Sequence, residues 1–313
     1  MYYLSCTNLL NLSKQAFWRY LHTFDTVLTS CEGVLWNDDR EIKGSAATLN
    51  RLREIGKQIF FITNNSRRTR EEVVRHAEKM GFIIHKNEVI SSSYLIAYYL
   101  TEMKFSGTVY VVGSRGLVEE LNAVGIKHIG TGPDIAIGTI PEVYDNVYID
   151  PSVTAVVVGL DEHFSYVKII KASTYLQNPN CEFLAASFEE RRSGFIPKVF
   201  PATGAILTAI ETCSGRKAKI LGKPGVFLAE YLTRRHCVDS QRSLFIGDRL
   251  RVDMLLGYRC NFQTLLVLSG LTKREDLNRK RRSITSETKA EDILLPNLYT
   301  KALEDILPYL ILK

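Results

Sequence analysis

The chain has 313 residues, of which 45% are hydrophobic and 24% charged, with a formal net charge of +6. These totals are typical of a globular protein with a sizeable core, and they exclude a disordered chain. No apolar run approaches the roughly 20 residues of a membrane-spanning helix, and the first 21 residues lack the basic start and clean apolar stretch of a secretory signal. We therefore expect a cytoplasmic protein with one large domain or two ordinary ones.

Short β-branched and aromatic runs alternate with longer amphipathic segments along the chain. The runs predict strands at 24–30, 57–64, 108–114, 154–160, 181–187, 217–223, 243–248 and 263–270. Residues 45–56 place their apolar side chains on one helical stripe and end at Gly56, and residues 68–81 repeat the pattern. This alternation predicts βαβ units and buried parallel sheets, which is the α/β class.

The residues that close the predicted strands are candidates for function, because ligands bind beyond the carboxyl ends of parallel strands. Residues 63–66 (Thr-Asn-Asn-Ser) offer hydroxyl and amide donors where a helix is expected to begin, and such positions bind anions. Lys223 supplies a cation, and Asp248 and Asp253 supply the oxygen ligands that Mg²⁺ prefers. Each motif alone has an ordinary interpretation as a cap, a turn or a surface charge. Their shared position at strand ends favours a phosphate site.

Other reactive or charged residues favour structural interpretations. Six scattered cysteines without a CxxC pair indicate reduced thiols rather than a zinc site or disulfide scaffold, and we expect Cys31 to be inert, with redox sensitivity as its alternative. His163 is expected to be a structural residue at a helix start. The basic segment 273–282 lacks interleaved aromatics and predicts a solvated helix face or loop, so we expect neither nucleic acid nor membrane as a partner.

These motifs resemble the haloacid dehalogenase-like phosphatases of the chronophin type, which includes pyridoxal phosphate phosphatase and phosphoglycolate phosphatase. The resemblance runs nearly end to end, through FDTVL (24–28), GVLW (33–36), ITNNSRRTR (62–70), VVVGLDEHFSY (156–166), PATGAILTAIETCSGRKAKILGKPG (201–225), IGDRLRVDMLLG (246–257) and LVLSGLT (266–272). It implies a Rossmann-like parallel-sheet core, here 1–103 and 209–313. A smaller inserted α/β capping domain, here 104–208, would close the site and select the substrate.

The resemblance also implies a role for each site residue. In the family, one aspartate of the first motif attacks phosphorus, and a second protonates the leaving oxygen and activates water. Ser30 and Glu32 stand at these two positions, so both catalytic carboxylates are altered. The binding positions are Thr63, Asn64, Asn65 and Lys223 for phosphate, and Asp248 for Mg²⁺, with Glu32 as a weak and Asp253 as a supporting ligand. Further departures lie at Arg251, at Val252 and in residues 185–189, so the organic half of the ligand is not defined.

The two substitutions predict an impaired enzyme. A serine hydroxyl is neutral, and a phosphoserine is much harder to hydrolyse than an acyl phosphate. We expect a rate deficit of about 10⁴ to 10⁶, equivalent to about 5 to 8 kcal/mol of barrier. Magnesium binding should be weakened or depend on the ligand, because one charged ligand is missing. Loss of the negative charge at Ser30 should favour phosphate binding.

The predicted function is therefore that of a pseudophosphatase, built on a Mg²⁺-dependent phosphomonoesterase scaffold, which binds a small phosphorylated metabolite. The alternative is an active phosphatase with a divergent first motif. A homodimer, or a heterodimer with an active paralogue, is expected to form through the capping domain, because members of the family often dimerise.

Overall fold

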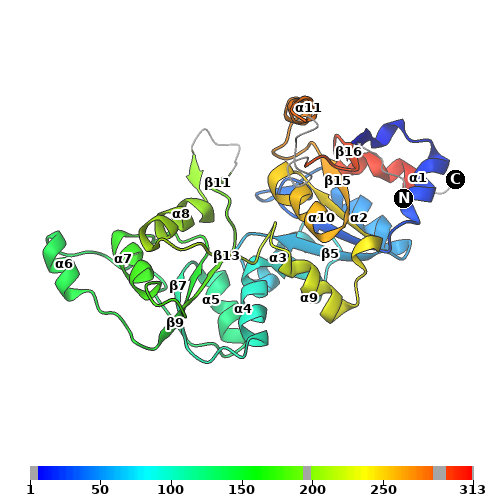
Figure 1. Ribbon diagram of the computed structural model, residues 1–313. Coiled ribbons are helices and arrows are strands. Elements are labelled where there is room, and N and C mark those ends of the chain that lie inside the picture. The colour runs from blue at the N-terminus through cyan, green and yellow to red at the C-terminus, as the bar shows by residue number, and fades with distance from the viewer. Residues whose placement is uncertain (1–5, 193–198, 285–293, 312–313) are drawn as a thin grey trace. The chain divides into compact units, whose positions relative to one another are not determined.

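The structure, a computed structural model, describes residues 6–192, 199–284 and 294–311 (Figure 1). It forms two compact units. Unit 1 comprises Met1–Thr63, Val73–Ile90 and Val226–Lys313, and unit 2 comprises Asn64–Glu72 and Ser91–Gly225. Within the described residues, no helix combines the length and apolar character needed to cross a membrane.

Unit 1 is built on a seven-stranded sheet with the order β1-β16-β15-β14-β2-β5-β6. Its strands are β1 (Thr7–Asn8), β2 (Thr26–Ser30), β5 (Gln58–Thr63), β6 (Val89–Ser91), β14 (Ser243–Gly247), β15 (Gln263–Val267) and β16 (Leu298–Thr300). The pairs from β1 to β5 are all parallel. Every residue of β2 and β14 is buried, as is typical of the central strands of a parallel sheet.

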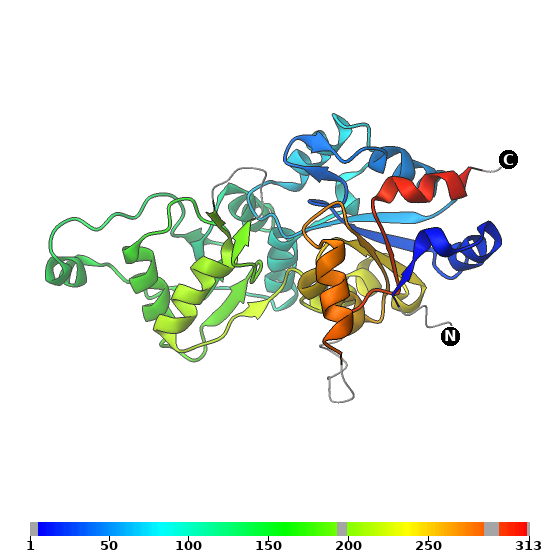
Figure 2. The ribbon, with the colours of Figure 1, turned by 90° about the horizontal axis from the view of Figure 1, so that it is seen from above.

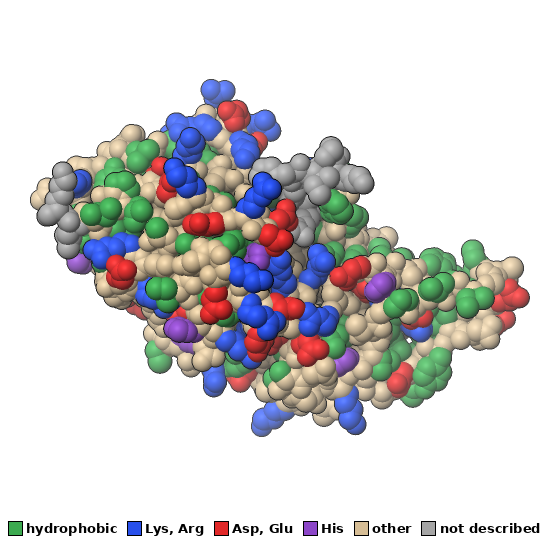
Figure 3. Space-filling model, turned by 180° about the vertical axis from the view of Figure 1, so that it is seen from behind, with side chains coloured by type: hydrophobic (Ala, Val, Ile, Leu, Met, Phe, Trp, Pro, Cys, Tyr) green, Lys and Arg blue, Asp and Glu red, His purple; other side chains and the backbone are tan. Residues whose placement is uncertain are grey.

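Helices surround this sheet. They are α1 (Lys14–Leu21), α2 (Ser45–Glu54), α3 (Arg70–Glu78), α9 (Phe227–His236), α10 (Leu255–Cys260), α11 (Arg274–Arg282) and α13 (Leu307–Leu310), with 3-10 turns η1 (Leu9–Asn11), η2 (Lys86–Glu88), η3 (Ser240–Arg242) and η5 (Leu303–Ile306) and a π-helical turn η4 (Leu250–Met254). Two short antiparallel strands, β3 (Trp36–Asn37) and β4 (Arg40–Glu41), follow β2. The basic segment forms α11, where Leu277 is the buried residue, and Figure 3 shows its cationic and acidic side chains interleaved on the surface.

Unit 2 has its own five-stranded sheet, with the order β13-β10-β9-β7-β8, and every pair is parallel. Its strands are β7 (Thr108–Val112), β8 (His128–Ile129), β9 (Val153–Val158), β10 (Glu182–Ala185) and β13 (Lys219–Ile220), and a separate antiparallel pair is formed by β11 (Arg191–Arg192) and β12 (Phe200–Pro201). Its helices are α4 (Ser92–Glu102), α5 (Arg115–Ala123), α6 (Ile140–Asn146), α7 (Tyr166–Tyr175) and α8 (Thr203–Ser214). Helices α7 and α8 pack together, as do α4 and α5, and the two pairs lie on opposite sides of the sheet (Figures 1 and 2).

The α/β class with parallel sheets is confirmed, but the boundaries of the units differ from the predicted ones. The predicted cap was 104–208, whereas unit 2 extends from Ser91 to Gly225 and adds Asn64–Glu72. The reason is packing, because α4 lies against α5 and β13 pairs with β10. Both elements therefore belong to unit 2, although their sequences flank the predicted insertion.

Candidate functional site

The first part of the candidate site lies where β2 and β5 end in unit 1. Ser30 is the last residue of β2 and is buried, with 4% of its surface exposed. The adjacent strand β5 ends at Thr63, because Ser30 pairs with Ile62 in the parallel register. Thr63 Oγ1 donates a hydrogen bond to Glu32 Oε2 at 3.0 Å. The hydroxyl that the resemblance assigns to phosphate is thus engaged by the Glu32 carboxylate.

Asp248 follows the next strand, β14, and is buried at the same sheet edge. Its Oδ2 accepts a hydrogen bond from the Leu271 N–H at 2.8 Å. Two glycines allow this close approach, since a Cβ added to Gly33 would lie 2.4 Å from Asp248 Oδ2 and one added to Gly270 would lie 2.1 Å from it. Gly33 also has a φ of +82°, a conformation that side chains disfavour. The sequence around Asp248 is therefore shaped to hold a carboxylate in a narrow space.

Asp253 stabilises the backbone of the loop that carries Asp248. It is fully buried, and its Oδ2 accepts hydrogen bonds from the N–H groups of Asp248 at 3.0 Å and Arg249 at 3.1 Å. A carboxylate at the start of a helical turn satisfies N–H groups that have no partner within the helix. In this structure Asp253 Oδ2 accepts hydrogen bonds from the loop backbone and so fixes the loop that carries Asp248.

The remaining predicted residues lie in unit 2. Asn64 Oδ1 accepts from the Lys223 N–H at 2.8 Å, and Asn64 Nδ2 donates to the Lys223 carbonyl at 3.0 Å. Asn65 Oδ1 accepts from the Arg67 N–H at 3.2 Å. Lys223 itself is buried and precedes a cis peptide bond to Pro224. Asn64 therefore fixes the loop that carries Lys223, and Asn65 fixes the backbone of its own loop, which are roles that the sequence did not suggest.

The carboxylate oxygens of Asp248 and Glu32 are compatible with a magnesium ion whose coordination shell is completed by oxygen atoms of a bound ligand. Among the described residues, no group of three or more His, Cys, Asp or Glu side chains is gathered into a metal-binding cluster. Asp248 and Glu32 nevertheless follow neighbouring parallel strands of one sheet. Mg²⁺ commonly binds one or two carboxylates and completes its shell with water and phosphate oxygens.

The structure also describes the residues at which the later motifs differ from the family pattern. Arg251 is exposed, and Val252 is buried in the π-helical turn. In residues 185–189, Ser187 is buried and its Oγ accepts from the Glu189 N–H at 3.1 Å.

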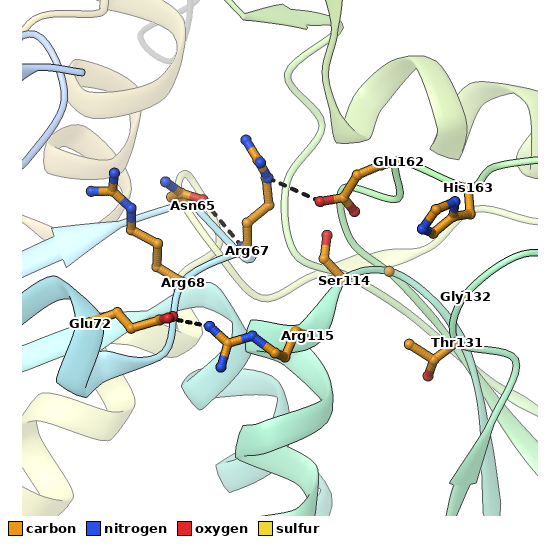
Figure 4. A pocket seen from close by; sticks show the side chains of 11 residues that line it. Asn65, Arg67, Arg68, Glu72, Ser114, Arg115, Thr131, Gly132, Glu162 and His163 are labelled. Atoms are coloured by element: carbon orange, nitrogen blue, oxygen red, sulfur yellow. Dashed lines mark hydrogen bonds and ion pairs between the residues drawn. The ribbon is translucent and has the colours of Figure 1, made fainter. Parts of the chain in front are cut away.

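A polar pocket lies within unit 2, and the predicted phosphate-binding residue Asn65 is one of the residues that line it. It has a volume of about 520 Å³ and is lined by residues that include Arg67, Arg68, Glu72, Arg115, Glu162 and His163 (Figure 4). His163 precedes α7 by three residues, so it lines the pocket rather than starting the helix, and its N–H is held by Asp161 Oδ1 at 2.8 Å. The arginines of ITNNSRRTR and the Gly-Ser-Arg turn after β7 were the available sequence signals.

Comparison with known proteins identifies the family that this chain resembles. Residues 27–127 match the family model of haloacid dehalogenase-like hydrolases, and residues 220–298 match a second model described as HAD-hydrolase-like. The rat glycerol-3-phosphate phosphatase is 36% identical over 295 residues, which cover 91% of each chain. Human chronophin is 34% identical over 286 residues, which cover 90% of this chain and 91% of chronophin.

A solved structure shares the fold. A glycerol phosphate phosphatase from Mycobacterium tuberculosis, determined in complex with magnesium, superposes with a TM-score of 0.72 at 21% identity, covering 93% of this chain and 77% of the other. The rat relative, which is named as a glycerol-3-phosphate phosphatase, and chronophin both align over nearly their whole length. This chain belongs to the family of haloacid dehalogenase-like hydrolases, and the predicted resemblance is confirmed.

Proposed function

We propose that this protein binds phosphorylated small molecules and hydrolyses them very slowly, as a pseudophosphatase. The observation that carries the proposal is the buried end of β2, where Ser30 supplies a neutral hydroxyl at the nucleophile position. Glu32 Oε2 accepts a hydrogen bond from the Thr63 hydroxyl, with 3.0 Å between the two oxygens. A neutral alcohol needs an adjacent base to attack phosphorus, and the base at hand already accepts a hydrogen bond from another group.

The binding half of the site supports retention of a ligand. Lys223 is buried in unit 2, and its backbone is held on both sides by the Asn64 amide. A lysine ammonium in a partly desolvated position attracts a phosphate dianion strongly, because screening by water is reduced. At the end of β2, the neutral side chain of Ser30 would not repel a phosphate dianion as an aspartate would.

For the metal, we propose that Asp248 would hold Mg²⁺, with Glu32 as a second and weaker ligand. When bound, the ion would neutralise phosphate charge and polarise the phosphoryl oxygen. Asp253 would act through the loop backbone, by keeping the N–H groups of Asp248 and Arg249 in place. With one charged ligand fewer, occupancy should rise when phosphate contributes its own oxygens.

The alternative function is an active phosphatase in which Ser30 serves as the nucleophile. It is favoured by the rat relative, which is named as a glycerol-3-phosphate phosphatase and aligns over 91% of this chain. The first experiment separates the two functions by measuring Mg²⁺-dependent phosphate release from 4-nitrophenyl phosphate. Wild type is compared with the Ser30→Asp/Glu32→Asp double variant and with Ser30→Ala.

We expect the double variant to turn over about 10⁴-fold faster than wild type or more. Ser30→Ala should be indistinguishable from wild type if the hydroxyl does no chemistry. Turnover in wild type that Ser30→Ala abolishes would instead establish Ser30 as a nucleophile and sink the proposal. Calorimetric titration with inorganic phosphate then tests binding, which Lys223→Met should weaken.

We also propose that the protein associates with a second copy through unit 2. Five exposed apolar side chains gather in and near α6, namely Ile135, Ile137, Ile140, Tyr144 and Tyr148. Figure 3 shows hydrophobic side chains on this part of the surface. Because a patch of this kind commonly marks a contact between proteins, Ile137→Glu should shift sedimentation toward the monomer. A wild-type profile that contains only monomer would rule out this association.

A further inference from the structure

The turn that carries Glu32 closes onto the first residue of β3. The Gly33 N–H donates a hydrogen bond to the Trp36 carbonyl at 2.9 Å, and the Trp36 N–H donates to the Cys31 carbonyl at 3.3 Å. Glu32 also forms an isolated β-bridge with Trp36. Because these bonds all join the turn to one residue, the backbone position of Glu32 depends on where Trp36 is held.

The Trp36 side chain is held by aromatic packing. It is 2% exposed, and its ring meets the ring of Phe82 edge-on, with 5.6 Å between the two centroids. The imidazole of His76, on α3, meets the same indole edge-on at 5.3 Å. Aromatic pairs in this geometry are attractive beyond the apolar area that they bury. Helix α3 therefore contacts the residue that closes the Glu32 turn.

His76 also contacts the tip of the hairpin formed by β3 and β4. Its Nε2 lies 2.9 Å from the Asp38 carbonyl oxygen, and its Nδ1 lies 3.6 Å from Asp39 Oδ1. The imidazole side chain is 13% exposed, whereas the Asp39 side chain is 83% exposed. One imidazole thus joins the base of the hairpin, at Trp36, to its tip. We call these three contacts the His76 clamp.

The hairpin needs an anchor at its tip more than at its other arm. In β4, Glu41 Oε1 accepts a hydrogen bond from the Ala46 N–H at 3.0 Å, which fixes that arm to α2. At the tip, Asp38 has a φ of +52°, a left-handed conformation that side chains disfavour although aspartate tolerates it better than most. The His76 clamp therefore acts where the backbone conformation is least favourable.

The geometry gives protonation of His76 a definite effect. A carbonyl oxygen can only accept, so Nε2 carries the hydrogen that bonds to Asp38. In the neutral imidazole, Nδ1 is then a lone pair that faces the Asp39 carboxylate. In the imidazolium both nitrogens are donors, so protonation adds an ion pair with Asp39 and keeps the bond to Asp38. The hairpin is therefore held more firmly when His76 is charged.

The other charged groups around His76 are of both signs. Glu72 lies one helical turn before it on α3 and is paired with Arg115, and Lys79 lies three residues after it. The indole packed against the imidazole has no titratable group. Asp39 is the carboxylate that faces Nδ1, so protonation acts on the hairpin through Asp39.

We propose that His76 is a positioning residue for the strand-end site of unit 1. It holds the hairpin, and through Trp36 the residue at position 32, more firmly when its imidazole is protonated. The statement about position 32 rests on the proposed function, in which Glu32 belongs to the site, whereas the clamp on the hairpin does not depend on that function.

The first test reads the clamp through Trp36 fluorescence. The chain has two tryptophans, so Trp18→Phe leaves Trp36 as the single indole emitter. A charged imidazole in contact with an indole quenches its emission, and a neutral imidazole does so far less. Emission should therefore fall as the pH is lowered from about 8 to about 5.5, across the ordinary range of histidine titration.

Variants in this background assign the transition. His76→Gln should abolish it, because an amide does not titrate. Asp39→Asn should move its midpoint to lower pH, because the carboxylate no longer favours the charged imidazole. His85→Gln, at an exposed histidine of unit 1, is the matched control and should leave the transition unchanged.

The second test measures the turn and hairpin directly. His76→Ala removes the whole clamp, whereas His76→Gln keeps an amide N–H within reach of the Asp38 carbonyl. Hydrogen exchange of the peptide 31–41, followed by mass spectrometry, should be about tenfold faster in His76→Ala, since local opening is easier. At about pH 8, where the wild-type imidazole is neutral, His76→Gln should exchange like wild type. Thermal melts verify that each variant is folded.

Turnover tests the consequence for position 32. In the Ser30→Asp/Glu32→Asp variant, His76→Ala should lower kcat with 4-nitrophenyl phosphate about tenfold and leave KM unchanged, because a displaced acid impairs chemistry more than binding. His76→Gln should match its parent at about pH 8 and fall below it at about pH 6, where the parent gains the ion pair with Asp39.

The outcomes separate the clamp from the proposed function. Emission that is independent of pH, or that changes alike in His76→Gln, would overturn the clamp. Equal exchange of the peptide 31–41 in His76→Ala and wild type, or an unchanged kcat, would overturn the positioning of residue 32. A Ser30→Asp/Glu32→Asp variant without turnover would count against the proposed function alone, because fluorescence and hydrogen exchange do not depend on it.

Discussion

The carboxyl ends of the two sheets carry different charged side chains, acids in unit 1 and arginine–glutamate pairs in unit 2. Both are parallel, and both bring polar side chains from distant parts of the sequence to their carboxyl ends. In unit 1 these side chains are the acids Glu32, Asp248 and Asp253, whereas in unit 2 they include Arg67 and Arg115. The comparison teaches that topology determines where a site forms and that the charge at the strand ends determines its ligand. An acidic edge needs a metal ion before it can hold phosphate, whereas paired arginines and glutamates balance each other's charge.

The largest expected effect uses metal removal to test the acidic edge of unit 1. In the Ser30→Asp/Glu32→Asp variant, a chelator should lower phosphatase turnover by about 10³-fold, because the charge of the phosphoryl group is no longer neutralised. Steady-state assays with 4-nitrophenyl phosphate measure the turnover. Turnover that the chelator leaves unchanged would show that the acidic edge works without a metal ion and would remove the distinction.

The second prediction concerns the buried ion pair between Lys168 of α7 and Asp161, which follows β9 in unit 2. Lys168→Met should lower the free energy of unfolding by about 3 to 5 kcal/mol, because it leaves Asp161 charged and buried without its partner. The double variant Lys168→Met/Asp161→Leu should recover much of that loss. Urea denaturation followed by circular dichroism measures both. Equal stability of the single and double variants would show that the two residues act independently.

The third prediction tests the corresponding buried acid beneath the acidic edge. Asp253→Ala should cost about 2 to 3 kcal/mol, because the N–H groups of Asp248 and Arg249 lose a charged acceptor. Asp253→Asn retains one amide oxygen and should cost less. Urea denaturation ranks the two variants. If they are equally destabilised, the hydrogen bonds to the loop are not the reason for the loss.

The fourth prediction sharpens the contrast in charge. Glu32→Gln should tighten phosphate binding about fivefold in the presence of Mg²⁺, since it removes a negative charge beside Thr63 while an amide can still accept its hydrogen bond. Thr63→Val, which removes the hydroxyl, is the control and should weaken binding. Calorimetry with inorganic phosphate gives both affinities. Weaker binding by Glu32→Gln would indicate that Glu32 serves mainly as a metal ligand.

The smallest expected effect concerns Asp25, which precedes β2 and belongs to no proposed ligand site. Hydrogen bonds from Arg242 lower the pKa of Asp25 below its usual value. The pair therefore adds stability above the usual aspartate range, near pH 4, and this stability is lost as the pH falls through the lowered pKa. The difference in melting temperature between wild type and Arg242→Gln should shrink at that point. A difference that stays constant with pH would contradict the linkage.

The alternation of strands and helices could be predicted from sequence because it depends on local periodicity. The buried runs at 24–30, 57–64 and 243–248 became β2, β5 and β14 with small shifts at their ends. Strands of two or three residues, such as β1 and β8, carry too little local pattern to be seen. The limits of unit 2 differ from the predicted cap for a related reason, since only packing shows that α4 and β13 belong with unit 2.

The sequence by itself determined the chemistry of the altered motif, because Ser30 and Glu32 differ from aspartate wherever they lie. It also located the strand ends at which Lys223 and Asp248 stand. Only the tertiary structure decided what each side chain contacts, such as the bond from Thr63 to Glu32. The same holds for the polar pocket of unit 2, whose walls come from segments separated by up to about a hundred residues. Contacts between such distant segments depend on how strands are ordered in a sheet, and local patterns do not encode that order.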